Sequence, residues 1–596
     1  MSLATRVLEA MMENDYVAPA PVMFAMFQCL EAIDDIDDPI VTRKLLECFE
    51  GFYSYIPSQY NFHRDDFLQI ATDQGFQPSD NKQPSVPLYE ILTDCGKAIM
   101  DLVGPIFNKE IVAKGYFPEL RKQLLDNENA ASGISQVDRI LGRKDVIGSD
   151  EYDGEPEELI RLYLRHTPFY QLLYTQVPFV IPRKTFASHG IILAPPNHGK
   201  TQLLGALIAQ SLKEETGIFV LDPHGDLFNI LRTRVAPNRC IILDPDTNPP
   251  PLNFLDFGTS TEAQTLQTFS YLMSALVGGL SPKQQNIVPY LLKLLRKVDN
   301  PSIETLAHIV GDKSKSVDKS PYSAAIRELD KTDQLFFDTV WFSGMAETKE
   351  ALNWRLLGAL SSETFRQMFS ARYNSFNPDA AIRDRKVVLV KGGRNSLGDF
   401  GMEVFLQFII TQYFAAGLRR ASIPSEKRHL CIMFVDEAHT VLKSKTINDI
   451  LVELRKFQCA FVAATQVWHQ VGEEVKAAVL GATAIRAVGP VSHSDAVVLS
   501  REMGLGTTPE FIRSMKAQER SHADWAFYVS GMTDRAVKVR VPYGVLESLP
   551  QVPVADVATI QVREFLLEER QTVAAPQPGS AAIASQPFIK PGKDWD

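Results

Sequence analysis

The chain has few cysteines, and they form no pairing or metal-binding pattern. Its 596 residues include six cysteines, and no two are arranged as C-x-x-C. Some of them lie in apolar, strand-like runs. This distribution is typical of buried thiols in a reducing cytosol and argues against disulfides or a zinc site. The six are Cys29, Cys48, Cys95, Cys240, Cys431 and Cys459.

Long apolar runs are also lacking. The N-terminus has no basic segment followed by an apolar one, so no signal peptide is predicted. The most apolar early run, "VAPAPVMFAMFQCLEAI", contains two prolines, Gln28 and Glu31, and is too short to span a membrane. We therefore expect a cytoplasmic protein with no membrane span.

Positive charge is not in excess either. The formal net charge is −11, which disfavours a surface coated with nucleic acid or anionic lipid, so any nucleic-acid contact must be local. The H-E-x-x-H and G-x-S-x-G motifs of other hydrolases are absent. With 45% hydrophobic and 22% charged residues, the composition is that of a globular protein with a sizeable core.

Residues 1–155 are predicted to form a helical accessory domain. Apolar residues recur every three to four positions in "VTRKLLECFEGFYSYI" and "LYEILTDCGKAIMDLVGPIF". The segment between them, around residues 57–88, is predicted to be a long loop. The stretch "GSDEYDGEPEE" has neither Lys nor Arg and is predicted to be a solvated linker, with a domain boundary near residue 155.

From residue 190, short apolar runs alternate with helical patterns. This alternation predicts an α/β fold with a mainly parallel sheet covered by helices on both faces. The core is expected at 156–255 and 381–550, with a helical insertion at 256–380 and a terminal hairpin formed by "DWAFYVSG" and "RAVKVRVPYGV". Residues 551–596 are predicted to be a largely disordered tail. The runs are "GIILA", "GIFVLD", "CIILD", "KVVLV", "CIMFVDE", "CAFVAAT" and "ATAIRAV".

The stretch "GIILAPPNHGKTQLL", residues 190–204, matches the phosphate-loop pattern G-x-x-x-x-G-K-[ST] except at its first position, Ala194. Backbone N–H groups at the start of the following helix are expected to point at phosphates. The two prolines precede these donors, and alanine is tolerated where φ is not positive. Lys200 is expected to neutralise the β- and γ-phosphates of ATP, and Thr201 to ligate Mg²⁺. The predicted nucleotide contacts are Ala194, Asn197, His198, Gly199, Lys200, Thr201, Gln202 and Asp222.

A second motif, "CIMFVDEAH", places two carboxylates after an apolar strand. Asp436 is predicted to hold Mg²⁺, and Glu437 to polarise the attacking water. Gln466, after the strand "CAFVAAT", is placed to sense the γ-phosphate or orient that water, with a strand-end cap as the alternative. The letters "DEAH" also suggest DEAH-box helicases, but the Q-x-x-G-R-x-G-R string of those proteins is absent.

The string "FVLDPHGDL" at 219–227 resembles the D-P-x-G-[DE] signature of the HerA/FtsK superfamily of ring-shaped DNA-pumping ATPases. In addition, "VDEAHTVL", "LRKFQCAFVAATQ" and "DAVVLSREMG" resemble the TraG/TraD-type conjugative coupling ATPases and their soluble HerA-like relatives. The resemblance covers about residues 165–545. It implies a RecA-like P-loop NTPase core assembled as a hexamer. Two features depart from the family. The loop has Ala194 where the family pattern has glycine, and the N-terminal membrane helices of the conjugative coupling proteins are lacking.

The resemblance also implies an arginine that acts across the subunit boundary. The matching residue is Arg455, although it could instead be a solvated helix residue. Arg486 and Arg501 are the second candidates for this role. Asp222, His224 and Asp226 could bind a metal, although this spacing on a turn is more typical of a hydrogen-bonded loop brace.

Two main functional hypotheses follow. The first is an ATP-driven DNA translocase, whose candidate pore residues are Lys391, Arg394, Lys443 and Lys445, each of which could equally be an ordinary surface residue. The second is a nucleotide-gated oligomer that presents its N-terminal helical domain to a protein partner. Non-catalytic ATP binding is a third reading, disfavoured by the intact acidic pair.

Overall fold

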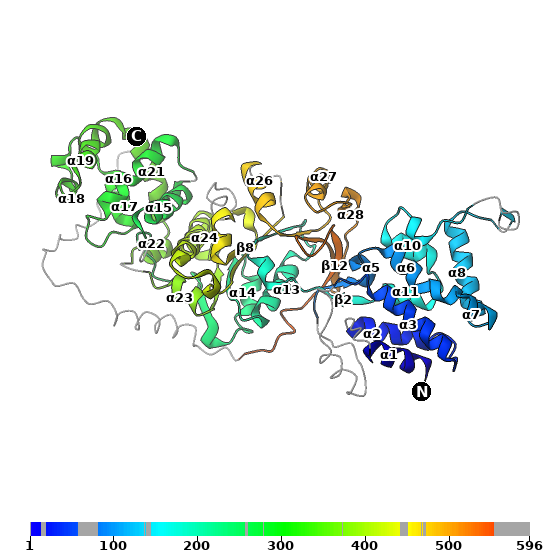
Figure 1. Cartoon of the computed structure of the whole chain (residues 1–596). Helices are drawn as coiled ribbons and strands as arrows, with labels where there is room; N and C mark the ends of the chain where they lie inside the picture. Colours follow the sequence, from blue (N-terminus) through cyan, green and yellow to red (C-terminus); the bar gives the residue numbers. More distant parts are fainter. Residues whose placement is uncertain are drawn as a thin grey trace.

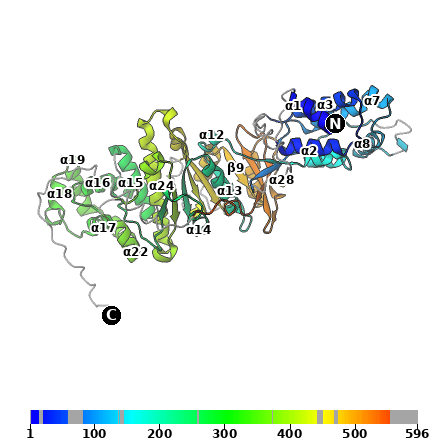
Figure 2. The same ribbon diagram turned by 90° about the horizontal axis from the view of Figure 1, so that it is seen from below.

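The computed structural model describes residues 2–13, 20–57, 82–135, 137–138, 145–256, 260–277, 279–371, 374–440, 451–466, 468 and 473–552. These residues form three parts that follow one another along a long axis (Figure 1). The N-terminal helices lie at one end, an α/β core lies in the middle, and a helical insertion lies at the other end. The view from below shows the same order (Figure 2).

The core is built on one mixed sheet, whose described strands follow the order β2-β1-β12-β11-β9-β3-β8-β7-β4-β6-β5, with β10 paired to β11. From β9 to β5 all neighbours are parallel. The parallel strands are β3 (Gly190–Leu193), β4 (Gly217–Asp222), β5 (Cys240–Leu243), β6 (Val387–Lys391), β7 (Cys431–Val435), β8 (Cys459–Thr465) and β9 (Ile485–Val488). The others are β1 (Ser85–Pro87), β2 (Gln176–Pro178), β10 (Ala517–Gln518), β11 (His522–Val529) and β12 (Val537–Pro542).

The seven predicted apolar runs are the parallel strands, so the expected α/β fold is confirmed. Their residues are apolar on both faces because helices cover both faces of the sheet. In β3, Ile191 and Leu193 join one hydrophobic cluster, whereas Ile192 joins the other. The predicted terminal hairpin is also present, since β11 and β12 pair antiparallel from His522–Pro542 to Phe527–Val537.

Each face of the sheet has its own helices. The first face carries α13 (Lys200–Lys213) and α14 (Asp226–Leu231), whose apolar side chains share a cluster with the N-terminal helices. On the second face, α24 (Arg394–Arg419) shares a cluster with the insertion. Shorter helices of the core are α12 (Arg183–Phe186), α23 (Pro378–Arg383), α26 (Glu473–Ala482), α27 (His493–Arg501) and α28 (Pro509–Arg513).

The insertion between β5 and β6 is helical, as predicted. Its helix α15 packs along α24, and aromatic side chains join the two parts, with the ring centroids of Phe254 and Phe408 5.4 Å apart. The insertion comprises α15 (Glu262–Val277), α16 (Pro282–Leu295), α17 (Ile303–Gly311), α18 (Ser323–Arg327), α19 (Lys331–Phe336), η6 (Phe337–Trp341), α20 (Phe342–Gly344), α21 (Ala346–Leu360) and α22 (Glu363–Phe369).

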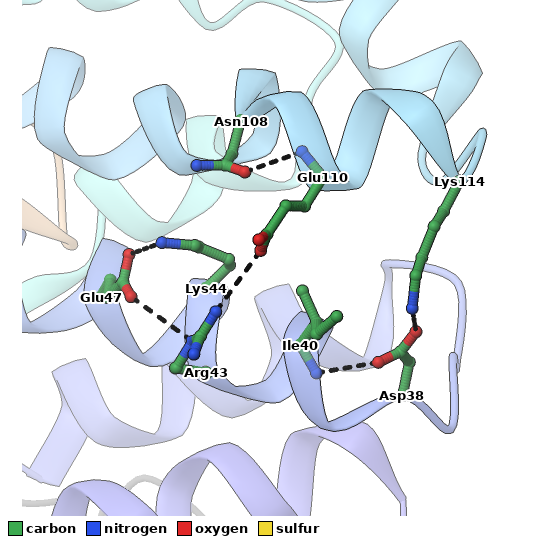
Figure 3. A network of polar contacts seen from close by, with 8 residues as sticks. All are labelled: Asp38, Ile40, Arg43, Lys44, Glu47, Asn108, Glu110 and Lys114. Carbon is green, nitrogen blue, oxygen red and sulfur yellow. Dashed lines mark hydrogen bonds and ion pairs between the residues drawn. The ribbon is translucent and has the colours of Figure 1, made fainter.

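The N-terminal part is a helical bundle with a polar network on its surface (Figure 3). Arg43 on α3 lies 3.4 Å from Glu110 on α7. Asp38 caps α3 through Ile40 N–H, and its pKa is lowered first by the hydrogen bond from Lys114. The network therefore ties α3 to α7. The helices are α1 (Leu3–Glu13), α2 (Ala20–Glu31), α3 (Pro39–Tyr53), α5 (Leu88–Ile91), α6 (Cys95–Val103), α7 (Lys109–Ala113), α8 (Pro118–Ala131), α10 (Pro156–Tyr163) and α11 (Pro168–Leu173).

The bundle extends beyond the boundary predicted near residue 155. Helix α10 packs on α8, and α11 packs on α2. The acidic stretch is not a free linker, because Ser149 is buried and its hydroxyl donates to the Gly96 carbonyl at 2.9 Å. The acidic side chains remain at the surface while the backbone packs on α6, a contact that charge composition does not reveal.

Three further predictions concern the cysteines, membrane-spanning helices, and the loop and tail segments. All six cysteines are buried free thiols. No described helix combines the length and apolarity needed to cross a membrane. Most of the predicted loop at 57–88 and nearly all of the predicted tail at 551–596 fall outside the described residues, although Ser85–Pro87 forms β1.

The bundle joins the core through strand pairing and a buried ion pair. Strand β1 pairs with β12 and β2. Beside it, Arg535 Nη2 lies 3.0 Å from Glu90 Oε2, and the Glu90 side chain is almost fully buried. Burial raises the pKa of Glu90 to about 7, and the attraction of Arg535 opposes this shift only in part.

This shift predicts a pH dependence of stability. The folded chain retains the Glu90 proton up to about pH 7, whereas the unfolded chain releases it near the ordinary value of 4.5. The folded state therefore binds more protons in this window, and the free energy of unfolding should fall by roughly 3 kcal/mol as pH rises through it. Urea unfolding between pH 5 and 8 measures this. Glu90→Gln should lose this part of the slope; an unchanged slope would contradict the assignment.

Candidate nucleotide site

The loop between β3 and α13 has the geometry of a phosphate-binding loop. Gly199 precedes α13 with φ 88°, and Asn197 also has a positive φ, 63°. Ala194 is not among the residues with positive φ. It is fully buried, and its N–H points at the Thr465 carbonyl 3.4 Å away. Glycine is therefore not required at position 194, and the substituted loop keeps its shape.

The loop is anchored by His198. Its side chain is buried, with Nε2 3.0 Å from the Asp524 carbonyl of β11 and its ring 4.9 Å from that of Trp525. Burial lowers the pKa of His198, so the neutral ring donates this hydrogen bond. The imidazole is thus occupied by the sheet, which leaves the backbone N–H of His198 as its predicted phosphate contact. Trp525 was not predicted as part of this site, because it belongs to a strand remote in sequence.

The predicted Mg²⁺ ligands, Thr201 and Asp436, lie in the first turn of α13 and directly after β7. Thr201 Oγ1 donates to Asp436 Oδ2 at 3.3 Å. Burial raises the pKa of Asp436 to about 6, and the nearby charge of Lys200 opposes the shift. A hydroxyl and a carboxylate side by side are hard oxygen ligands, which Mg²⁺ prefers. The two residues therefore fit this ion.

Glu437 is held in a strained position beside Asp436. It has φ 47°, is buried, and donates its N–H to Asp436 Oδ1 at 2.9 Å. The Gln466 amide donates to Glu437 Oε1, and His439 Nδ1 lies 3.3 Å from Oε2. The sequence predicted that Gln466 and Glu437 both act near the attacking water, but it did not predict the hydrogen bond between them. His439 was not among the predicted site residues, although its position two residues after Glu437 was an available signal.

Lys200 lies between the loop and the acidic pair. Burial lowers its pKa, and the carboxylates of Glu437 and Asp436 counteract this. The sheet order explains the convergence: β8 lies between β3 and β7, so the ends of three adjacent parallel strands deliver the loop, Gln466 and the acidic pair. This edge of an open parallel sheet is where ligands bind.

Two predicted nucleotide contacts have other partners here. Asp222 accepts three backbone N–H groups, from His224 and Gly225 at one oxygen and Phe228 at the other. Its carboxylate braces the turn before α14, and its contact with a nucleotide stays a prediction. Gln202 Oε1 accepts the Gly544 N–H at 2.8 Å. Among the described residues, no cluster of three or more His, Cys, Asp or Glu is arranged to bind a metal, which favours the brace over the metal reading of Asp222, His224 and Asp226.

Arg455 lies away from this site. It begins η10 (Arg455–Phe457), is exposed, and precedes β8, whereas Gln466 follows it. The two residues are therefore at opposite ends of a strand about 20 Å long. His189 fixes the neighbouring segment, because it accepts the Phe461 N–H at Nδ1 and donates from Nε2 to the Leu451 carbonyl at 2.8 Å. Within one chain, Arg455 does not reach the phosphates.

The remaining candidate cations are placed as follows. Arg486 donates to the carbonyls of Glu502 and Leu480, which gives it a structural role, while Arg501 is exposed. Lys391 is paired with Asp246 at 3.0 Å, and Arg394 with Asp399 at 2.6 Å. The other two candidate pore residues, Lys443 and Lys445, lie outside the described residues.

Solved structures similar to this chain include two of TrwB. The unbound bacterial conjugative coupling protein TrwBdeltaN70 is 16% identical over 62% of this chain and 87% of its own, with a TM-score of 0.45. Plasmid coupling protein TrwB in complex with ADP and Mg²⁺ is 18% identical over 64% and 90%, with a TM-score of 0.44.

A third similar structure is VirB4 of Thermoanaerobacter pseudethanolicus, 12% identical over 59% of this chain and 88% of its own, with a TM-score of 0.41. No protein-family model and no curated protein sequence matches the chain.

Proposed function

We propose that this chain binds ATP with Mg²⁺ and hydrolyses it to drive the movement of DNA through a ring of identical subunits. The observation that carries the hydrolysis is the convergence of Lys200, Thr201, Asp436, Glu437 and Gln466 at the ends of three adjacent strands. Residues from two distant parts of the sequence meet there in the arrangement that phosphoryl transfer to water requires.

Each residue has a part in this reaction. Backbone N–H groups from His198 to Thr201 cradle the phosphates at the start of α13. The Lys200 ammonium neutralises charge that develops on the β- and γ-phosphates. Thr201 and Asp436 would hold Mg²⁺, which supplies further charge neutralisation when bound. Glu437 polarises the attacking water, and the Gln466 amide holds its carboxylate in place through the hydrogen bond to Oε1.

The proposed ring and its DNA substrate are supported by the position of Arg455, the net charge and the motif resemblance. Arg455 is exposed at the end of β8 opposite the acidic pair, so any role in hydrolysis would have to be at the site of a neighbouring subunit rather than its own. The net charge of −11 restricts DNA contact to a local surface, such as the channel of a ring. A hexamer is the assembly that the motif resemblance implies.

ATPase rates with and without double- and single-stranded DNA, across a salt series, test this proposal. We expect DNA to raise the rate and its affinity to fall linearly with salt on a double-logarithmic scale. The Glu437→Gln chain controls for contaminating ATPase. A rate and an affinity unchanged by DNA at low salt would reject translocation and favour the nucleotide-gated assembly that presents its N-terminal helices to a protein partner.

A further inference from the structure

The segment directly after β12, Tyr543 to Leu546, contacts the phosphate loop and the start of α13. A Cβ placed on Gly199 would lie 3.0 Å from Cε1 of Tyr543 and 3.2 Å from its hydroxyl oxygen. One residue later, the Gly544 N–H donates to Gln202 Oε1 at 2.8 Å. Leu546 then packs against Gly205, where an added Cβ would meet its Cδ1 at 2.9 Å. The segment is thus in direct contact with the loop and the first turns of α13.

Tyr543 and the acidic pair lie on opposite sides of the loop. In the sheet order, β7 is on one side of β3, beyond β8, whereas β12 is on the other side, beyond β9 and β11. Lys200 and Thr201 bind the β- and γ-phosphate end of a nucleotide, which faces Asp436 and Glu437. The α-phosphate and the nucleoside must then extend away from β7, toward the side of Tyr543 and Gly544.

On the basis of the nucleotide function proposed above, we propose that the Tyr543 ring forms one wall of the subsite for the nucleotide base. The ring is half-buried, and in the described part of the chain its hydroxyl has no hydrogen-bond partner. An aromatic face of this kind can stack on any base, because every base has a π-face.

The backbone at Tyr543 is held in place by a hydrogen bond at the end of the hairpin of β11 and β12. Its N–H donates to the Ser521 carbonyl at 2.9 Å, and the preceding strand β12 pairs along β11. The same strand β11 anchors the loop through the bond from His198 to the Asp524 carbonyl. One hairpin therefore fixes both the phosphate loop and the aromatic ring, and this preorganisation lowers the entropic cost of binding.

The dissociation constants of ATP and of ribose 5-triphosphate, which keeps the sugar and phosphates but lacks the base, test this inference. For Tyr543→Ala we expect ATP to bind about 5- to 150-fold more weakly. Ribose 5-triphosphate should bind as it does to the unchanged chain. GTP should lose affinity to a similar extent as ATP, because stacking tolerates any base.

Two further variants complete the test. Tyr543→Phe should bind ATP normally, and Ser548→Ala, an exposed change just after this segment, serves as the matched control. Equal weakening of ATP and ribose 5-triphosphate would show that Tyr543 only supports the loop, and unchanged ATP binding in Tyr543→Ala would equally overturn the subsite. If the unchanged chain binds neither ligand, the nucleotide site itself is rejected rather than the role of Tyr543.

Discussion

Replacing Glu437 by glutamine is expected to lower the rate of ATP hydrolysis by about 10²- to 10⁴-fold, the contribution typical of a general base. The amide keeps the shape of the carboxylate and loses its ability to polarise water. Because Lys200, Thr201 and Asp436 are untouched, ATP should still bind. Single-turnover hydrolysis and equilibrium binding of ATP measure the two effects separately.

Glu426→Gln is the matched control for this substitution. Glu426 is an exposed carboxylate in the segment that leads into β7, and its exchange should change neither quantity. Lys200→Ala, in contrast, should weaken ATP binding itself, since this buried residue is the cation predicted to neutralise the β- and γ-phosphates. If Glu437→Gln lost ATP binding and hydrolysis to the same extent, the carboxylate would have a structural role in the site and no direct role in the reaction.

Arg455→Ala is expected to lower the turnover number by about 10³- to 10⁵-fold if this residue serves a neighbouring subunit. Its own site should bind ATP normally, because Arg455 lies at the far end of β8. Mixing this variant with Lys200→Ala subunits should restore activity, since some interfaces then combine an intact loop with an intact arginine. The steady-state ATPase rate of mixtures at several ratios measures the rescue.

Lys456→Ala provides the control for Arg455, because the two residues are adjacent and exposed. Its turnover number should stay within a few-fold of that of the unchanged chain. No rescue at any mixing ratio would contradict a role of Arg455 in trans and direct attention to Arg501, the other exposed candidate.

The sequence predicted the core strands well because a fully buried strand leaves a local signature. "GIILA" and "CIMFV" are continuous apolar runs, as both of their faces are covered by helices. The phosphate loop could also be predicted, because the start of the helix that is expected to supply its N–H donors is adjacent to it in sequence. Ala194 could be accepted because only a positive φ would have required glycine, and its φ is not positive.

Other features could not be predicted from the sequence, because they depend on residues that are remote along the chain. The helices α10 and α11 were assigned to the core, yet they pack on α8 and α2. Asp222 ends its strand as a ligand residue would, but the turn that follows uses both of its oxygens. Trp525 reaches His198 only because the fold brings strand β11 near the loop.

By itself the sequence determined that the chain builds a parallel sheet with a phosphate loop and an acidic pair, because those features arise from residues that are neighbours along the chain. The tertiary structure decided what surrounds them. It brought Gln466 to Glu437, placed Arg455 at the opposite end of β8, and laid Tyr543 beside Gly199. These contacts are set by strand order, which local periodicity does not encode.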